Sequence, residues 1–254
     1  MKKLLFLLLI PMLFTACDPV EPEIEGGTLQ INVRGLFGSE TLVLNDFYKL
    51  PDSSLVNFTS LLFYVSDIKL VKENDEEVLI KDVDMINFYK NHSTAATASL
   101  GETLTIEGVP EGEYKAIKFG IGLPASLNAT NPADYTSDNP MSKTEMYWDW
   151  RGTYIFSMIE GILDETDNGI INNDAYITIH SGSDAMYKTK ELTLPISITN
   201  DVETKVNFQL DAKKIYVTDT VFDIKNRNTS HTGPDDSDIA EEIITNLANA
   251  ISAE

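Results

Sequence analysis

Short runs in which apolar and polar residues alternate dominate this chain, and they constrain the fold more than any other feature. In the run LQINV the apolar residues are Leu29, Ile31 and Val33, and a similar run follows at residues 63–70. Successive side chains of a strand point to opposite faces of a sheet, so alternation with a period of two predicts strands with one buried face. The chain is therefore predicted to be mostly β.

Seven further segments have strand-like patterns and are separated by turn-forming residues. They are Val78–Ile86, Thr103–Ile106, Glu113–Gly120, Tyr154–Ile162, Ala175–Ser181, Lys190–Ile198 and Val202–Leu210. Turns are expected at residues 110–112 (PEG) and 167–169 (DNG), where Pro, Asn and Gly favour tight reversals. About nine strands at this spacing predict an all-β sandwich. No internal repeat or break in composition divides the chain, so we expect one domain.

The C-terminal segment has a helical pattern instead. Asp238 and Glu241 have the spacing of a capping box, which marks the start of a helix. Apolar residues then recur every four positions, at Ile239, Ile243, Leu247 and Ile251. We expect a C-terminal helix that packs on the sandwich.

The N-terminus has the features of an export signal. Lys2 and Lys3 precede an apolar run at residues 4–14, which is too short for a membrane-spanning helix of roughly 20 residues. Small residues and then Cys17 follow, an order that resembles the lipobox of bacterial lipoproteins. Residues 1–16 are therefore predicted to be a signal peptide, and Cys17 the lipidated first residue of the mature chain.

The segment after the cysteine predicts a tether between membrane and domain. Residues 17–27 are acidic and contain two prolines, a composition that gives an extended and stiff linker. The sandwich domain is then expected to span residues 28–254. Such acidic tethers resemble the surface-export signals of some Gram-negative lipoproteins. We expect an outer-membrane lipoprotein, with the periplasmic face and the cell surface both open as locations.

Charge and cysteine content exclude several classes of function. The chain has 19 Lys and Arg against 40 Asp and Glu, a formal net charge of -21, which opposes binding to nucleic acid. With Cys17 as its single cysteine, the chain by itself can form neither an internal disulfide nor a cysteine-rich metal site. The sequence also lacks a G-x-S-x-G elbow, an H-E-x-x-H motif and a Walker loop. We therefore do not expect an enzyme.

The most unusual segment is residues 146–156 (MYWDWRGTYIF), which contains both tryptophans. If the segment is extended, Trp148 and Trp150 project from the same face. Two neighbouring indoles on one face form either a plug in the core or a platform on which a ligand stacks. The residues alone leave both interpretations open.

The three histidines lie in different settings. In YITIHS, Ile177 and Ile179 alternate with His180, which places the imidazole on the more polar face of a strand. His231 lies in a polar loop before the predicted helix, and it would be exposed unless that loop folds back over the end of the sandwich. His92 lies in the polar segment KNHSTAATAS and has no further support as a functional residue. Taken alone, each histidine is more readily explained by a structural or solvent-exposed role than by metal binding.

Several segments, taken in order, resemble the MbnP-like family of bacterial copper-binding proteins, relatives of the methanotroph proteins MopE and CorA. The matching segments are FYVSDIKL (63–70), VPEGEY (109–114), FGIG (119–122), MYWDW (146–150), GTYIF (152–156), EG (160–161) and HSG (180–182). Each segment is weak alone, but their succession is specific and covers nearly all of the predicted mature chain.

The resemblance implies an envelope protein that binds copper for acquisition or storage. In such proteins a partner enzyme, a two-haem peroxidase-like protein, oxidises a tryptophan to kynurenine, whose aromatic amine then coordinates copper. Trp148 and Trp150 match the tryptophan pair, and the resemblance does not decide between them. His180 and His231 match the histidine ligands, and Met146 could add a thioether to Cu(I) or simply pack in the core.

Two alternatives without a metal stay open at this point. One is a surface adhesin or glycan-binding sandwich, in which the tryptophans stack on a ligand and the histidines are structural. The other is a structural component of an envelope assembly that uses a flat face of the sandwich.

Overall fold

A computed structural model describes residues 25–164 and 175–254 of the chain. The predicted signal peptide, Cys17, most of the acidic tether and the turn expected at 167–169 lie outside the described residues. Within these two ranges, no helix is both long enough and apolar enough to cross a membrane.

Nine strands of seven or more residues hold most of the strand residues of the described structure. They are β1 (Gly27–Phe37), β5 (Ser60–Lys72), β6 (Glu77–Asn87), β7 (Glu102–Val109), β8 (Gly112–Ile121), β11 (Ser157–Asp164), β12 (Ala175–Ser181), β13 (Lys188–Ile198) and β14 (Glu203–Asp211). The shorter strands are β2 (Glu40–Thr41), β3 (Tyr48–Lys49), β4 (Leu55–Val56), β9 (Tyr147–Trp148), β10 (Thr153–Tyr154), β15 (Thr229–Ser230) and β16 (Ile251–Ala253).

Helices are few and mostly short. The α-helices are α1 (Ala95–Ala98), α2 (Ala125–Asn128), α3 (Lys213–Tyr216) and α4 (Ser237–Ala250). Turns of 3₁₀-helix occur at Phe88–Lys90, Pro132–Asp134, Pro140–Ser142, Thr144–Met146 and Asp184–Met186.

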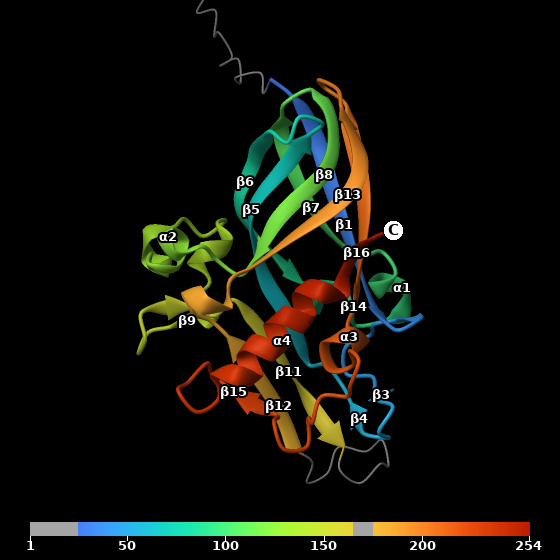
Figure 1. Ribbon diagram of the computed structural model, residues 1–254, viewed down its shortest axis with the longest axis vertical. Coiled ribbons are helices and arrows are strands. Elements are labelled where there is room, and N and C mark those ends of the chain that lie inside the picture. Colours follow the sequence, from blue (N-terminus) through green and yellow to red (C-terminus); the bar gives the residue numbers. More distant parts are fainter. Residues whose placement is uncertain (1–24, 165–174) are drawn as a thin grey trace, which may run out of the picture.

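Two large sheets enclose the core (Figure 1). In one sheet β14 lies between β16 and β1, and β1 also pairs with β7 and β2. The other has the order β13-β8-β5-β11-β12-β15, with β6 on β5 and the β3–β4 hairpin on β11. Aromatic side chains join the sheets, as where Phe119 of β8 stacks on Phe208 of β14 at 6.4 Å. The predicted all-β sandwich is confirmed.

The alternation that predicted the strands follows burial closely. Leu29, Ile31 and Val33 of β1 point into the core, and the residues between them are partly exposed. In β5 the pattern shifts by one residue after Ser66, because a bulge interrupts the ladder and Asp67 has a left-handed backbone with φ of 48°.

The larger sheet divides along one edge of β5. There Val65 pairs with Ile121 at the end of β8, and Phe63 pairs with Ser157 at the start of β11. The backbone of Tyr64 bridges the two strands, since its N–H donates to Phe156 O and its carbonyl accepts from Gly122 N. The chain between β8 and β11 therefore leaves the sheet at this point and carries α2 and the β9–β10 hairpin to one side (Figure 1).

The predicted C-terminal helix is present as α4, but its predicted ends are wrong. Asp236 is the N-cap residue, and its carboxylate accepts from the backbone of the preceding loop instead of capping the helix. Asp238 lies in the first turn and forms an ion pair with Arg227 rather than a capping box with Glu241. Ile251 lies beyond the helix, because it begins β16 and pairs with β14. The helix buries its apolar stripe, Ala240, Ile243, Ile244, Leu247 and Ala248, against the sandwich.

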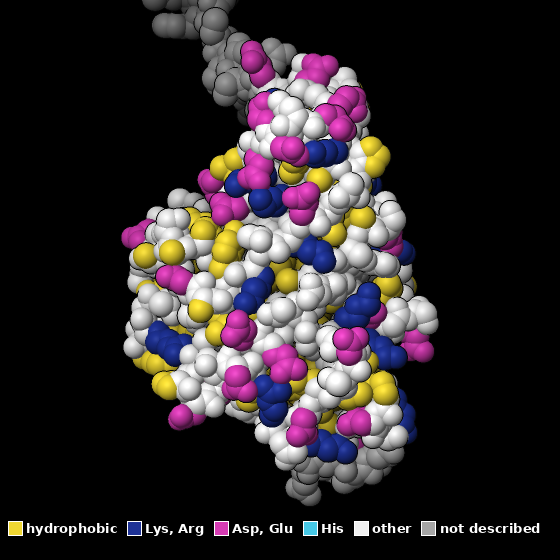
Figure 2. Space-filling view, viewed as in Figure 1, with side chains coloured by type: hydrophobic (Ala, Val, Ile, Leu, Met, Phe, Trp, Pro, Cys, Tyr) yellow, Lys and Arg dark blue, Asp and Glu magenta, His cyan; other side chains and the backbone are white. Residues whose placement is uncertain are grey.

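Acidic side chains are spread over the visible surface and are dense at the end where β1 begins (Figure 2). Glu25, Glu111 and Asp201 line a shallow hollow at that end.

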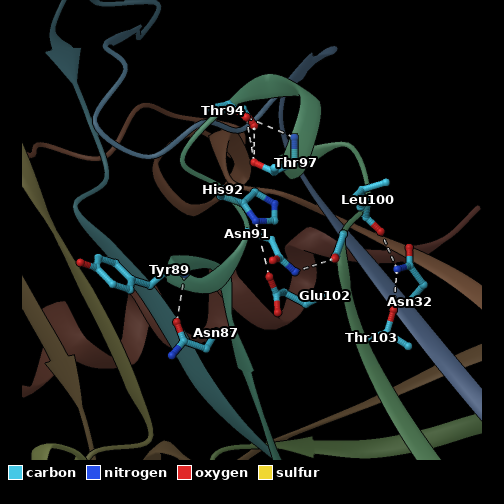
Figure 3. Close-up of polar contacts among 11 residues, drawn as sticks. Asn32, Asn87, Tyr89, Asn91, His92, Thr94, Thr97, Leu100, Glu102 and Thr103 are labelled. Carbon is cyan, nitrogen blue, oxygen red and sulfur yellow. Dashed lines mark hydrogen bonds and ion pairs between the residues drawn. The ribbon is translucent and has the colours of Figure 1, made fainter.

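His92 is fully buried, although it lies in a polar segment of the sequence. Its ring contacts Phe88 edge to face, and a Cβ added to Gly35 of β1 would lie 2.9 Å from its Nε2. Nδ1 lies 3.8 Å from Oε1 of Glu102, and the two side chains point toward each other (Figure 3). Among the described residues neither ring nitrogen has a hydrogen-bond partner. Burial lowers the pKa of His92 to about 4.

This buried imidazole predicts a loss of stability in acid. Between pH 6.5 and 4 the unfolded chain protonates His92 and the folded chain does not, so the free energy of unfolding falls as pH falls. The His92 contribution amounts to about 3 kcal/mol over this range, at about 1.4 kcal/mol per pH unit. We expect His92→Leu to flatten the pH dependence measured by urea unfolding.

Glu102 supplies the matched control. Burial raises the pKa of Glu102, so its contribution has the opposite sign: the folded chain holds a proton that the unfolded chain releases. Glu102→Gln, which mimics the protonated carboxyl at every pH, removes the cost of burying the ionised form at higher pH and should steepen the acid loss. Equal slopes for wild type and His92→Leu would contradict the assignment.

Candidate metal centre

The tryptophan segment forms a tight hairpin. The strand β9 ends at Trp148, whose carbonyl accepts hydrogen bonds from the backbone N–H groups of Arg151 and Gly152 at 2.9 and 2.8 Å. Gly152 has a φ of 67°, a left-handed conformation that glycine adopts without strain. The turn places Trp150 at the tip of the hairpin rather than on a strand.

The two indoles therefore have different surroundings, and the shared face expected for an extended segment does not form. Trp148 is 7% exposed and packs against Gly182, where an added Cβ would lie 2.8 Å from its Cζ3. Trp150 is 70% exposed. Their ring centroids are 6.1 Å apart and the rings are tilted by 48°. One indole belongs to the core and the other to the surface, so they do not form a flat stacking platform.

The structure brings His180 and His231 together. Strand β15 pairs in parallel with β12, with Thr178 opposite Thr229 and Ile179 opposite Ser230. The next residue is a histidine in each case, His180 within β12 and His231 just beyond β15, and the two imidazole rings meet edge to face with centroids 5.1 Å apart. His180 is 8% exposed, on the opposite face from the buried Ile177 and Ile179, and His231 is exposed. Two nitrogen donors from distant segments thus lie side by side.

The loop after His231 folds back over the end of β12. The Oγ1 of Thr232 donates to the carbonyl of His180 and accepts from the N–H of Gly182. The backbone N–H of His231 donates to the carboxylate of Asp236, just before α4. Thr232 has a φ of 55°, an uncommon conformation for a β-branched residue that its neighbours must hold in place.

Glu160 is a site residue that the sequence reasoning did not single out. Its Oε1 lies 3.0 Å from Nε2 of His180, so a proton on Nε2 donates to the carboxylate and leaves Nδ1 as the ring nitrogen able to bind a metal. The sequence feature that could have identified it is the Glu-Gly pair at 160–161, one of the segments that resemble the MbnP-like family. Gly161 is needed there because an added Cβ would lie 2.0 Å from the carbonyl oxygen of Asn57.

Arg151 is the second residue that the sequence reasoning missed. Its guanidinium carbon lies 5.2 Å from the Trp148 ring centroid and 5.0 Å from that of Trp150. The same group donates to the carbonyls of His231 and Thr232. A cation directly after the tryptophan pair was the sequence feature that could have identified Arg151, but its hydrogen-bond partners lie about 80 residues further along the chain.

The remaining candidate residues lie elsewhere. Met146 is fully buried and belongs to the hydrophobic core, and Met158 lies directly opposite His180 on β11. His92 occupies its own corner beside β1, and Cys17 lies outside the described residues. Across residues 25–164 and 175–254, no three His, Cys, Asp or Glu side chains form a ready metal site.

Opposing contacts control the protonation of His180, and they can be separated by substitution. Burial lowers its pKa, the Glu160 carboxylate opposes this, and the neighbouring His231 lowers it further. In a copper-free NMR titration, Glu160→Gln is expected to lower the pKa of His180 and His231→Leu to raise it. Shifts in the same direction for both variants would contradict this geometry.

Comparisons with known proteins agree with this architecture. A solved structure of MbnP from Methylosinus trichosporium matches with a TM-score of 0.53 and 13% sequence identity, covering 78% of this chain and 80% of that chain. At this identity the likeness shows a shared fold. No curated protein matches the chain at a significant level. The family model for MbnP matches residues 26–233, which is most of the chain, and the protein therefore belongs to the MbnP family.

Proposed function

We propose that this protein is an envelope lipoprotein that binds copper for acquisition or storage, and that it is a binding module rather than an enzyme. The observation that carries the proposal is the contact between His180 and His231, whose ring centroids are 5.1 Å apart. Imidazole nitrogen is a natural ligand for copper and does not require a thiolate. The donor set therefore suits a mature chain whose single cysteine is predicted to carry lipid.

A tryptophan-derived amine is the proposed third donor. An indole has a ring N–H and no lone pair available for a metal, whereas opening its ring to kynurenine gives an aromatic amine that can coordinate. A two-haem peroxidase-like partner would carry out this oxidation. We expect Trp148 to be the modified ligand, because it contacts Gly182, two residues beyond His180, whereas Trp150 points to solvent.

The protein's own residues prepare the histidine pair. Glu160 accepts from Nε2 of His180, which fixes the ring and directs Nδ1 toward a metal. Thr232 and Asp236 hold the backbone of the His231 loop. Bound copper would complete the centre, and the net negative charge of the chain would attract the cation.

Metal analysis of protein purified from its native host, together with peptide mass spectrometry, tests the proposal. We expect stoichiometric copper and kynurenine at Trp148. His180→Leu and His231→Leu should each reduce copper affinity at least about a hundredfold, whereas Glu160→Gln, which removes an outer partner, should cost about 10–100-fold.

His92→Leu is the matched control, because it removes the one histidine outside the centre and should leave copper affinity unchanged. Unmodified tryptophans combined with background copper would contradict the proposal. Copper binding that depends equally on His92 would contradict the assignment of the site.

Attachment to the membrane is a separate part of the proposal. We expect the full-length chain to incorporate labelled fatty acid and to fractionate with membranes, and Cys17→Ala to lose both properties. Protease accessibility in intact cells distinguishes the cell surface from the periplasmic face. Membrane association of the Cys17→Ala chain without lipid would contradict lipidation at this residue.

A further inference from the structure

Arg151 contacts both parts of the candidate metal centre, the tryptophan hairpin and the backbone of the His231 loop. One side of its guanidinium group faces the indoles of Trp148 and Trp150, at 5.2 and 5.0 Å from their ring centroids. Its Nη1 donates to the carbonyl of His231 at 2.9 Å, and its Nη2 donates to the carbonyl of Thr232. The residue thus joins two segments that are 80 residues apart in the chain.

The loop that Arg151 holds is a loop under strain. Thr232 has a φ of 55°, and a β-branched residue keeps such a conformation only where surrounding contacts impose it. Its side chain is anchored on β12 through His180 O and Gly182 N. The Arg151 hydrogen bonds hold the carbonyl of His231 and the carbonyl of Thr232. They therefore orient the peptide group that joins these two residues. Without these hydrogen bonds, Thr232 and Asp236 still hold the loop, but nothing fixes the two carbonyls that orient the exposed His231 ring toward His180.

We propose that Arg151 is a positioning residue that holds the His231 ring against His180 by clamping the backbone of residues 231–232 to the tryptophan hairpin. Its importance for copper rests on the proposed function, but the clamp itself is a property of the metal-free protein. This side chain adds a direct link between the tryptophan hairpin and the histidine loop, beside the indirect one through Gly182, which packs against Trp148 and donates to Thr232.

The geometry requires arginine rather than any cation. A planar guanidinium can donate two hydrogen bonds to adjacent carbonyls while its face lies on an aromatic ring, whereas a lysine ammonium is a point charge on a flexible stem. We therefore expect Arg151→Lys to retain the charge and lose most of the positioning, and Arg151→Met to lose both.

Arg227 provides a matched control variant. Its guanidinium carbon lies 4.7 Å from the Phe222 ring centroid, and it also forms two ion pairs with α4, through Asp238 and Glu242. It thus has an aromatic contact and two polar contacts, as Arg151 has, but none of them is with the tryptophan hairpin or a histidine. Arg227→Met is expected to lower the melting temperature without changing the histidine pair.

The experiment measures the imidazole rings by NMR in copper-free, full-length protein and then the Cu(I) affinity by competition. In Arg151→Met and Arg151→Lys we expect the contacts between the His180 and His231 rings to disappear, and the affinity to fall about tenfold or more. In Arg227→Met the ring contacts and the affinity should match wild type. Circular dichroism establishes that each variant is folded, and Arg151→Lys serves as the measured variant if Arg151→Met is not.

The outcomes separate the two proposals. Ring contacts that persist in a folded Arg151 variant, or that are lost equally in Arg227→Met, overturn the positioning role. If wild type binds no copper but Arg151 variants still lose the ring contacts, the proposed function fails and the positioning role stands.

Discussion

The candidate metal centre depends on the two-residue parallel ladder between β12 and β15. Because Ile179 lies opposite Ser230, the residues that follow, His180 and His231, lie side by side. A hydrogen bond from Thr178 N to Asn228 O extends the ladder in the other direction. A shift of one position would place the second histidine beside another residue of β12, on the opposite face. The short strand therefore sets the register of the whole site.

The long strands could be predicted from the sequence, whereas the junctions between segments could not. Alternation at Leu29, Ile31 and Val33 reports burial on one face of β1, which is a local property of a strand. Ile251 continued the spacing of the helix, but pairing with β14 places it on a strand. Asp238 had the spacing of a cap, but Arg227 attracts its carboxylate. For both Ile251 and Asp238, a tertiary contact overrides the local sequence pattern that predicted a place in the helix.

In the candidate site, too, some features could be predicted from the sequence and others could not. Alternation with Ile177 and Ile179 correctly assigned His180 to the other face of β12, and the family resemblance supplied His231. Neither could predict that the rings touch, because a two-residue parallel strand leaves no periodic signal in the sequence. The roles of Glu160 and Arg151 depend on hydrogen bonds to residues 20 and about 80 positions away. Such contacts become visible only once the sheet is assembled.

The contrast between the two indoles bears on how a modified residue could act as a ligand. Opening the indole ring adds rotatable bonds, and ordering a flexible side chain on a metal opposes binding through lost conformational entropy. At Trp150, 70% exposed, this freedom would be retained until the metal binds. At Trp148, packing against Gly182 already confines the side chain next to the His180 strand, so less entropy would remain to be lost. For the proposed modification, the buried Trp148 is therefore the less accessible target but the better organised ligand, and the exposed Trp150 beside it is the part of the hairpin that a partner enzyme would reach first.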